Sequence, residues 1–201
     1  DIIGGEDYFG STAQAKEEFK YLEETAKSYG FDGFIFVSNG QPKTLEEFGI
    51  NGYAAYHWGA DGYQYSINTG KNIELQEKAK TFYTIPTISV GYSDFAWRGV
   101  KMPLMTTEDW DKCHEWVKTT YIPKYAEKGT WEEKMVWIST WNEYGEGTYI
   151  MPCEGLRGFD YLDVLRDKYT DMPKELPHII PDENQLERIN HMYPQYRRFL
   201  R

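Results

Sequence analysis

Apolar residues along the chain fall into two kinds of pattern. Short continuous apolar runs predict strands that are buried on both faces, as the strands of a parallel sheet are. Between these runs, apolar residues recur every three or four positions, which is typical of a helix with one buried face. The predicted strands span residues 33–37, 53–58, 85–90 and 135–140.

Start and stop signals define the predicted helices. Ser11 with Gln14 three positions later is typical of a capping box, and Gly30 is a typical stop, so a first helix is predicted between them. Thr106 or Thr107 should begin a long helix that Pro123 kinks or ends. The inward-facing residues are expected to be Ala15, Phe19, Leu22 and Ala26, then Trp110, Cys113, Val117 and Tyr121. Shorter helices are predicted after Pro42, after Asn72, at 159–168 and around 186–192.

Strands that alternate with helices predict an α/β fold with a parallel sheet. A (β/α)8 TIM-type barrel usually needs about 250 residues, whereas this chain has 201 residues and four clear strand patterns. We therefore predict that residues 1–170 are roughly the C-terminal half of such a barrel, with the N-terminal half of the same barrel as a partner. The polar, proline-spaced tail, 171–201, should pack on the barrel or lead to a further segment.

The carboxyl ends of the strands are where parallel α/β folds place their sites. Each predicted strand delivers polar or aromatic side chains at that edge. Any one of them has an ordinary explanation, such as core packing or a surface ion pair, but four such strand ends together indicate a binding site. The candidate substrate-binding residues are Asn39, Tyr56, His57, Trp58, Tyr92, Asp94, Arg98, Trp141, Asn142 and Tyr144.

Residues 141–148, Trp-Asn-Glu-Tyr-Gly-Glu-Gly-Thr, are the most informative part of the chain. They place Glu143 and Glu146 three positions apart, just past a strand end. In a helical turn these two carboxylates would share one face and would not both ionise easily, so one could act as an acid. Paired carboxylates are what glycosidic bond cleavage requires. A solvated turn with no role is the ordinary alternative, but Gly145 and Gly147 allow a sharp turn and close approach of a ligand.

The segment from Trp137 to Thr148 resembles the signature of glycoside hydrolase family 99 and of its WbsX-like relatives, which are often found near polysaccharide glycosyltransferases. Residues 85–98 and 158–162 are also similar to that family, and the resemblance extends over residues 30–170. It implies a (β/α)8 barrel that hydrolyses α-linked mannose-type oligosaccharides or polysaccharides with retention of configuration.

The resemblance also implies roles for individual residues. Glu143 would assist attack by the sugar's own 2-hydroxyl group, and Glu146 would be the general acid/base at the glycosidic oxygen. Asn142 would hold the sugar or orient Glu143. Position 145 is glycine where characterised endomannosidases carry a bulkier residue.

Composition narrows the class of partner. A net charge of −10 without a basic cluster argues against nucleic acid, and no apolar run approaches the roughly 18 residues of a membrane span. The four histidines and two cysteines lack metal-ligand spacing, so no metal or other cofactor is expected, and both cysteines are predicted to be buried free thiols. Aromatic residues, 17% of the chain, suit sugar rings. An acidic, cysteine-poor chain fits a secreted or periplasmic enzyme, and the opening Asp1-Ile2-Ile3 suggests a processed chain or a fragment.

The sequence leaves four functions open. The first is a retaining hydrolase of α-mannosides, and the second is a polysaccharide-biosynthesis domain of the WbsX-like kind. The third is a non-catalytic carbohydrate-binding module, and the fourth is a structural fragment. The presence of both Glu143 and Glu146 argues against the third, because binding alone rarely needs a carboxylate pair so placed.

Overall fold

The structure is a computed structural model that describes residues 11–39, 49–56, 83–93, 95–99, 104–153 and 158–192. The chain divides into two compact units, Asp1–Thr170 and Asp171–Arg201, and each is considered by itself. Within the described ranges, no helix combines the length and the apolar character needed to cross a membrane.

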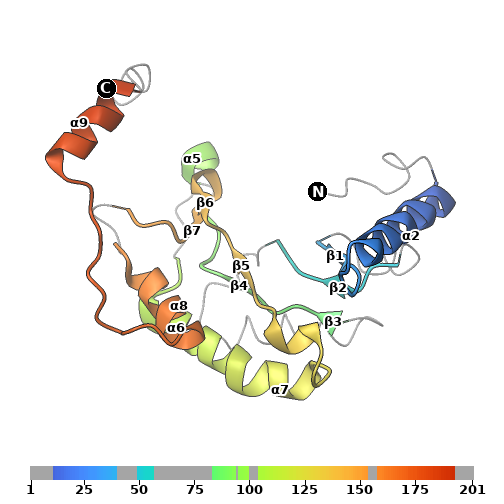
Figure 1. The fold of residues 1–201 in the computed structure, drawn as a ribbon. Coiled ribbons are helices and arrows are strands. Elements are labelled where there is room, and N and C mark those ends of the chain that lie inside the picture. Colours follow the sequence, from blue (N-terminus) through green and yellow to red (C-terminus); the bar gives the residue numbers. More distant parts are fainter. Residues whose placement is uncertain are drawn as a thin grey trace. The chain divides into compact units, whose positions relative to one another are not determined.

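The first unit is built on parallel strands (Figure 1). β1 (Val37–Ser38) pairs with β2 (Gly52–Tyr53), β2 pairs with β3 (Tyr83–Thr84), and β4 (Thr87–Ser89) pairs with β5 (Trp137–Ser139). Between β3 and β4 the backbone bonds to both sets of strands, because Ile85 N–H donates to Tyr53 O and Pro86 O accepts from Trp137 N–H. The parallel pairing of consecutive strands confirms the predicted α/β class.

The strands are shorter than predicted, most clearly at the first one. The prediction that a buried strand begins at Gly33 is wrong, because Phe34 and Ile35 are exposed and β1 begins at Val37. Two backbone N–H groups before β1 donate to side chains, whereas Phe36 O accepts from Gly52 N–H of β2 at 3.2 Å. Phe34 N–H donates to the Glu23 carboxylate at 3.0 Å, and Phe36 N–H donates to Asn51 Oδ1 at 2.8 Å.

The first helix, α2 (Thr12–Ser28), forms where its cap predicted it. The Ser11 side chain accepts a hydrogen bond from Gln14 N–H, and Gly30 follows the helix with φ 87°. Ala15, Phe19 and Ala26 are buried as predicted. Leu22 was wrongly assigned to the core: it is 41% exposed. The buried face of α2 is therefore narrower than the sequence pattern suggested.

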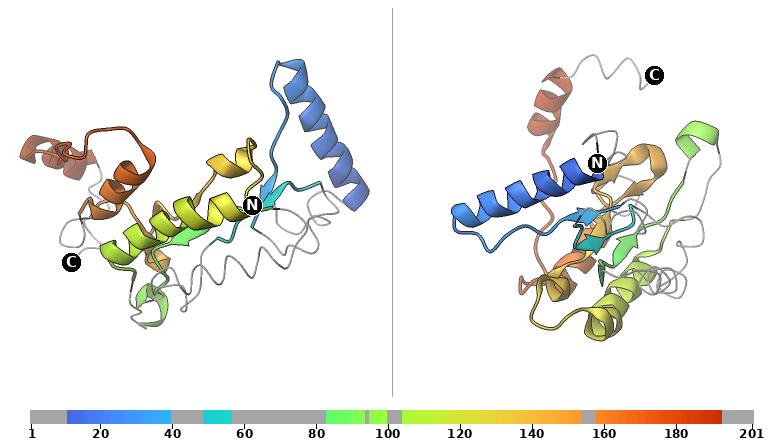
Figure 2. Two further views of the ribbon diagram at one scale, coloured as in Figure 1. Left: turned by 90° about the horizontal axis from the view of Figure 1, so that it is seen from below. Right: turned by 90° about the vertical axis from the view of Figure 1, so that its right-hand side faces the viewer.

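The long helix is also where the sequence placed it, and Figure 2 shows it as one continuous rod. Thr106 caps its start by accepting from Asp109 N–H at 3.0 Å. All four residues predicted to face inward are at most 1% exposed. A π-helical turn ends at Tyr121, two residues before Pro123, which has no N–H to donate, and the helix ends two residues after the proline. Its parts are α6 (Thr107–Trp116), η3 (Val117–Tyr121) and α7 (Ile122–Tyr125).

The core lies between this long helix, the strands and α8 (Asp160–Tyr169). Tyr121 anchors the helix to the sheet, because its hydroxyl donates to Thr84 O at 2.9 Å. Tyr161 anchors α8, because its hydroxyl donates to Met105 O and its carbonyl accepts from Trp110 Nε1 at 3.2 Å. The burial and hydrogen bonds of these aromatic side chains hold the long helix and α8 against the strands.

Other predicted elements have mixed outcomes. The helices predicted after Pro42 and Asn72 lie outside the described residues. The predicted 159–168 helix is α8, and the second unit contains α9 (Glu183–Met192) where the tail predicted a helix. Cys113 is buried and outside any disulfide, as predicted, whereas Cys153, which forms no disulfide either, is only half-buried. A short 3-10 turn, η4 (Trp131–Lys134), precedes β5.

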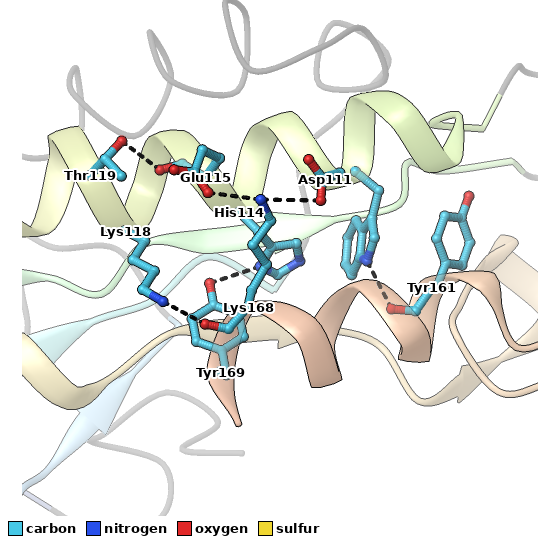
Figure 3. Close-up of polar contacts among 9 residues, drawn as sticks. Asp111, His114, Glu115, Lys118, Thr119, Tyr161, Lys168 and Tyr169 are labelled. Carbon is cyan, nitrogen blue, oxygen red and sulfur yellow. Dashed lines mark hydrogen bonds and ion pairs between the residues drawn. The ribbon is translucent and has the colours of Figure 1, made fainter. Parts of the chain in front are cut away.

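His114 is a buried titratable group at the contact between α6 and α8 (Figure 3). Its Nδ1 lies 2.8 Å from the Tyr169 hydroxyl. Above the ring, Lys168 forms ion pairs with Glu115 at 2.7 Å and with Asp111 at 3.2 Å. Burial first, and then the Lys168 ammonium, lowers the pKa of His114 from 6.5 to about 3. The imidazole is therefore neutral in the folded protein at neutral pH.

This burial makes stability depend on pH. Because the pKa of His114 is about 3 in the folded state and 6.5 in the unfolded state, the unfolded chain binds the proton first. Stability that is present above pH 6.5 should be lost as pH falls towards 3, at up to roughly 1.4 kcal/mol per pH unit. Urea unfolding at a series of pH values should show a flatter dependence for His114→Gln. Because the ion pairs of Lys168 are unchanged in that variant, an equally steep dependence would assign the effect to Glu115, whose pKa the Lys168 ammonium lowers.

Candidate active site

The two glutamates of the sequence motif lie on a short hairpin that follows β5. The hairpin consists of β6 (Asn142–Glu143), the 3-10 turn η5 (Tyr144–Glu146) and β7 (Thr148–Tyr149), and we call residues 142–149 the carboxylate loop. β6 and β7 pair antiparallel, with Glu143 opposite Thr148. Glu143 therefore lies on β6 and only Glu146 lies in the 3-10 turn, so the two glutamates do not share one helical turn.

Local hydrogen bonds hold the carboxylate loop in place. The Thr140 hydroxyl donates to Thr148 O and accepts from Glu143 N–H at 3.2 Å. Gly147 closes the turn with φ 65°, a conformation that favours glycine. A Cβ at Gly147 would also lie 3.0 Å from Ser93 Cβ. Both the backbone conformation and the close neighbour therefore require glycine there.

Glu143 and Glu146 are both half-buried but have different neighbours. Glu143 Oε2 accepts a hydrogen bond from the Tyr56 hydroxyl at 3.3 Å. The backbone carbonyl of Glu146 accepts from Ser93 N–H at 2.7 Å, and its side-chain Oε2 atom is buried. The segment after β2 thus contacts Glu143 through Tyr56, and the segment after β4 contacts Glu146 through Ser93.

The Tyr56 phenol lies close enough to both carboxylates for their charges to change its pKa. Burial raises its pKa above the usual value, and the negative charges of Glu143 and Glu146, together with the hydrogen bond to Glu143, raise it further. The pair and the phenol therefore form one electrostatic group from two strand ends. The strand-end argument expected Tyr56 and Glu143 at the same edge of the sheet, and the hydrogen bond between them brings these two side chains together.

Exposed aromatic rings surround the carboxylate loop. Trp141 is 52% exposed and Tyr144 is 47% exposed. The Tyr144 ring packs on Tyr149 with 5.0 Å between centroids, and its hydroxyl donates to Met151 Sδ at 3.3 Å. Flat faces beside a carboxylate pair are suited to the apolar faces of sugar rings.

The sequence of this chain also matches a known family. Residues 54–165, more than half of the chain, match the profile of the family described as glycosyltransferase WbsX. The chain belongs to the WbsX family. The resemblance that the sequence motif suggested is thereby confirmed at the family level.

Comparison with solved structures adds a second similarity. The WbsX chain is similar to the glycoside hydrolase family 99 endo-α-mannosidase of Bacteroides thetaiotaomicron, solved in complex with bis-tris-propane, with 20% identity and a TM-score of 0.40. That match covers 68% of the WbsX chain and 44% of the other, so the chain spans less than half the length of that structure. No curated protein matches the WbsX chain.

The remaining candidate residues of the WbsX chain are placed unevenly. Asn142 is exposed on β6, Tyr92 is half-buried after β4, and Arg98 is exposed at the end of α5 (Phe95–Arg98). Asn39 is exposed after β1, and the contacts described for the carboxylate loop do not include it. His57, Trp58 and Asp94 lie outside the described residues.

One aromatic residue at this site was missed among the sequence candidates. Trp97, on α5, lies against Gly145 of the carboxylate loop. The signal was present, because Trp97 directly precedes the candidate Arg98 at the third strand end. What the sequence could not show is a contact between residues 48 positions apart. Within the described residues, no group of three or more His, Cys, Asp or Glu side chains is placed to hold a metal ion.

Proposed function

We propose that this WbsX-family chain is part of a (β/α)8 barrel that acts as a retaining glycoside hydrolase on α-mannoside-type oligosaccharides or polysaccharides. The observation that carries the proposal is the pair of half-buried carboxylates, Glu143 on β6 and Glu146 in η5, whose charges both act on the Tyr56 phenol. Family membership and the exposed rings of Trp141 and Tyr144 support a carbohydrate ligand.

In the proposed mechanism the two carboxylates have opposite tasks. Glu146, protonated, gives its proton to the glycosidic oxygen as the bond to the anomeric carbon breaks. Glu143, ionised, takes the proton of the sugar's 2-hydroxyl group while that oxygen attacks the same carbon. Glu146 then removes a proton from water, which opens the ring so formed, and Glu143 returns its proton to the 2-oxygen. Two inversions at one carbon give net retention.

The neighbours of the pair have supporting tasks. The hydrogen bond from Tyr56 fixes Oε2 of Glu143 towards the sugar. Asn142, adjacent to Glu143 on β6, holds a sugar hydroxyl or orients that carboxylate. Tyr144 on the carboxylate loop and Trp141 directly before it present apolar faces to the sugar rings, so the reacting groups and part of the binding surface lie on one short segment.

Polysaccharide biosynthesis is a second candidate function, favoured by the description of the matched family as a glycosyltransferase. In that case a carbohydrate hydroxyl group, not water, would attack the anomeric carbon. The same carboxylate could remove its proton, so the site geometry is compatible with both reactions. A non-catalytic binding module would use the rings alone.

The test is incubation of the protein with α-1,2-, α-1,3- and α-1,6-linked mannosides. Products are identified by mass, and their anomeric configuration is read by NMR before mutarotation. Release of a sugar with retained configuration is the expected result, and an inverted product would contradict the proposed pair chemistry. Formation of a longer glycan with an added acceptor would favour biosynthesis. Binding without either product would favour the binding module.

Tyr56→Phe should weaken catalysis without abolishing it. The substitution removes only the hydroxyl that donates to Glu143 and leaves the ring in place. A net hydrogen bond to a charged group contributes about 1.5–3 kcal/mol, which sets an upper limit of roughly tenfold to a hundredfold on the loss of kcat. Steady-state kinetics on the preferred mannoside measure this. An unchanged kcat would mean that the phenol does not orient Glu143 in the reacting complex.

A further inference from the structure

Trp97 lies against the carboxylate loop at Gly145. It belongs to α5, which follows β4 and contacts η5. A Cβ at Gly145 would lie 2.8 Å from Cζ2 of Trp97 and 3.3 Å from Cε2. The edge of the indole therefore occupies the space that a side chain at position 145 would need.

Packing rather than backbone conformation accounts for glycine at position 145. Gly147 has a positive φ, but Gly145 does not. Alanine would therefore suit the backbone at position 145, but its Cβ would meet the Trp97 indole, which supplies the three nearest atoms. The Trp97 ring on α5 therefore fills the space that a side chain at position 145 would occupy.

The rest of the Trp97 ring is open to solvent. The side chain is 62% exposed, more than the other tryptophans described beside the loop. Leaving a large apolar ring in water forgoes the free energy of its burial. A pyranose could recover this free energy, because it presents an apolar C–H face to the ring and hydroxyl groups around it. Nε1, 3.5 Å from the Cβ position of Gly145, adds a donor close to the loop.

The neighbours of the two carboxylates indicate which part of the substrate Trp97 would contact. Ser93, just before α5, donates from its backbone N–H to the Glu146 carbonyl at 2.7 Å. Glu143 instead receives its hydrogen bond from Tyr56 at the end of β2. Trp97 therefore lies on the same segment as Ser93, which is hydrogen-bonded to Glu146. In the proposed mechanism Glu146 protonates the leaving oxygen.

We propose that Trp97 is the platform for the sugar ring on the leaving-group side of the scissile bond, and that Gly145 sets the position of this platform. The assignment of the side rests on the proposed function, because it follows the role given to Glu146. The ligand is a pyranose joined through one of its hydroxyl groups to the mannose that is cleaved. Gly145 is then a specificity-determining residue, since any side chain there displaces the ring.

Two substrates separate this platform from the rest of the site. A manno-oligosaccharide has a leaving-group sugar, whereas α-mannosyl fluoride has none. Trp97→Ala should lower kcat/KM on the oligosaccharide at least about tenfold more than on the fluoride, mainly through KM. Trp97→Phe, which keeps a flat ring, should recover most of that difference. Equal losses on both substrates would overturn the proposal. Tyr21→Ala removes a similarly exposed ring, 64%, from α2 and should change neither value.

Gly145→Ala tests the matching of the two positions. Its Cβ should push the indole aside and reproduce the selective loss of oligosaccharide hydrolysis seen for Trp97→Ala. In a Trp97→Ala background the same substitution should have little further effect, because the ring it displaces is gone. Fully additive losses in the double variant would contradict the role given to Gly145.

Direct binding keeps Trp97 testable if no α-mannoside is hydrolysed, an outcome that would reject the proposed function itself. Calorimetric titration of the protein with a manno-oligosaccharide is then the deciding measurement. Binding at least about tenfold weaker in Trp97→Ala, and largely restored in Trp97→Phe, would still support the platform. Equal affinity of the variants, or no binding by the unmodified protein, would overturn it.

Discussion

Glu146→Gln is expected to lower kcat/KM on an unactivated α-mannoside by about a thousandfold, within the range of 10²–10⁴ typical of general acid–base catalysis. Glutamine has nearly the shape of glutamic acid but has no proton to give to the leaving oxygen. The side chain is half-buried in the carboxylate loop, so an isosteric change should leave the hairpin and the sugar-binding rings in place. Steady-state hydrolysis and calorimetric binding of the same mannoside measure the two effects separately.

The leaving group separates the roles of the two carboxylates. An aryl mannoside with a very acidic phenol needs little protonation, so Glu146→Gln should cleave it far better than it cleaves an oligosaccharide. Glu143→Gln should fail on both, because the 2-hydroxyl group must lose its proton in either case. Equal behaviour of the two variants on both substrates would contradict the assignment. Glu17→Gln, an exposed glutamate on α2, is the matched control and should leave kcat/KM unchanged.

Features that depend on neighbouring residues in the sequence were predictable. The Ser11 and Thr106 caps lie three residues from the N–H groups that they accept. The buried face of the long helix follows from its spacing alone, and all four of its predicted residues are buried. The glutamate pair was predictable for the same reason, because its turn is formed within residues 142–149.

Features that depend on distant residues were not predictable. Phe34 and Ile35 have the apolar pattern of a strand, but the side chains of Glu23 and Asn51 accept hydrogen bonds from the backbone N–H groups of residues 34 and 36. Trp97 could be noted as an aromatic residue at a strand end, but its contact with Gly145 requires the fold. The hydrogen bond between Tyr56 and Glu143 joins positions 87 residues apart in the same way.

Trp110→Ala should destabilise the protein by about 3–5 kcal/mol, the usual cost of truncating a fully buried tryptophan. Trp110 is 0% exposed, and its ring packs on His114 and Tyr161 with centroids 4.4 and 5.2 Å away. Truncation would leave a cavity between α6 and α8. It would also remove the donor to the Tyr161 carbonyl. The free energy of unfolding, obtained from urea titration, measures the sum of these losses.

A graded series shows whether Trp110 acts through burial. Trp110→Phe keeps one ring but loses the N–H donor and part of the volume, so its cost should lie between that of Trp110→Ala and zero, even if the alanine variant does not fold. Trp141→Ala removes the same side chain from a position that is 52% exposed and should change stability by less than about 0.5 kcal/mol. Because α6 and α8 pack on the strands whose ends carry the glutamates, loss of this contact should also reduce activity at temperatures where the protein begins to unfold. If Trp110→Ala and Trp141→Ala were equally stable, α6 and α8 would not be held together by this ring, and the frame beneath the carboxylate loop would need another explanation.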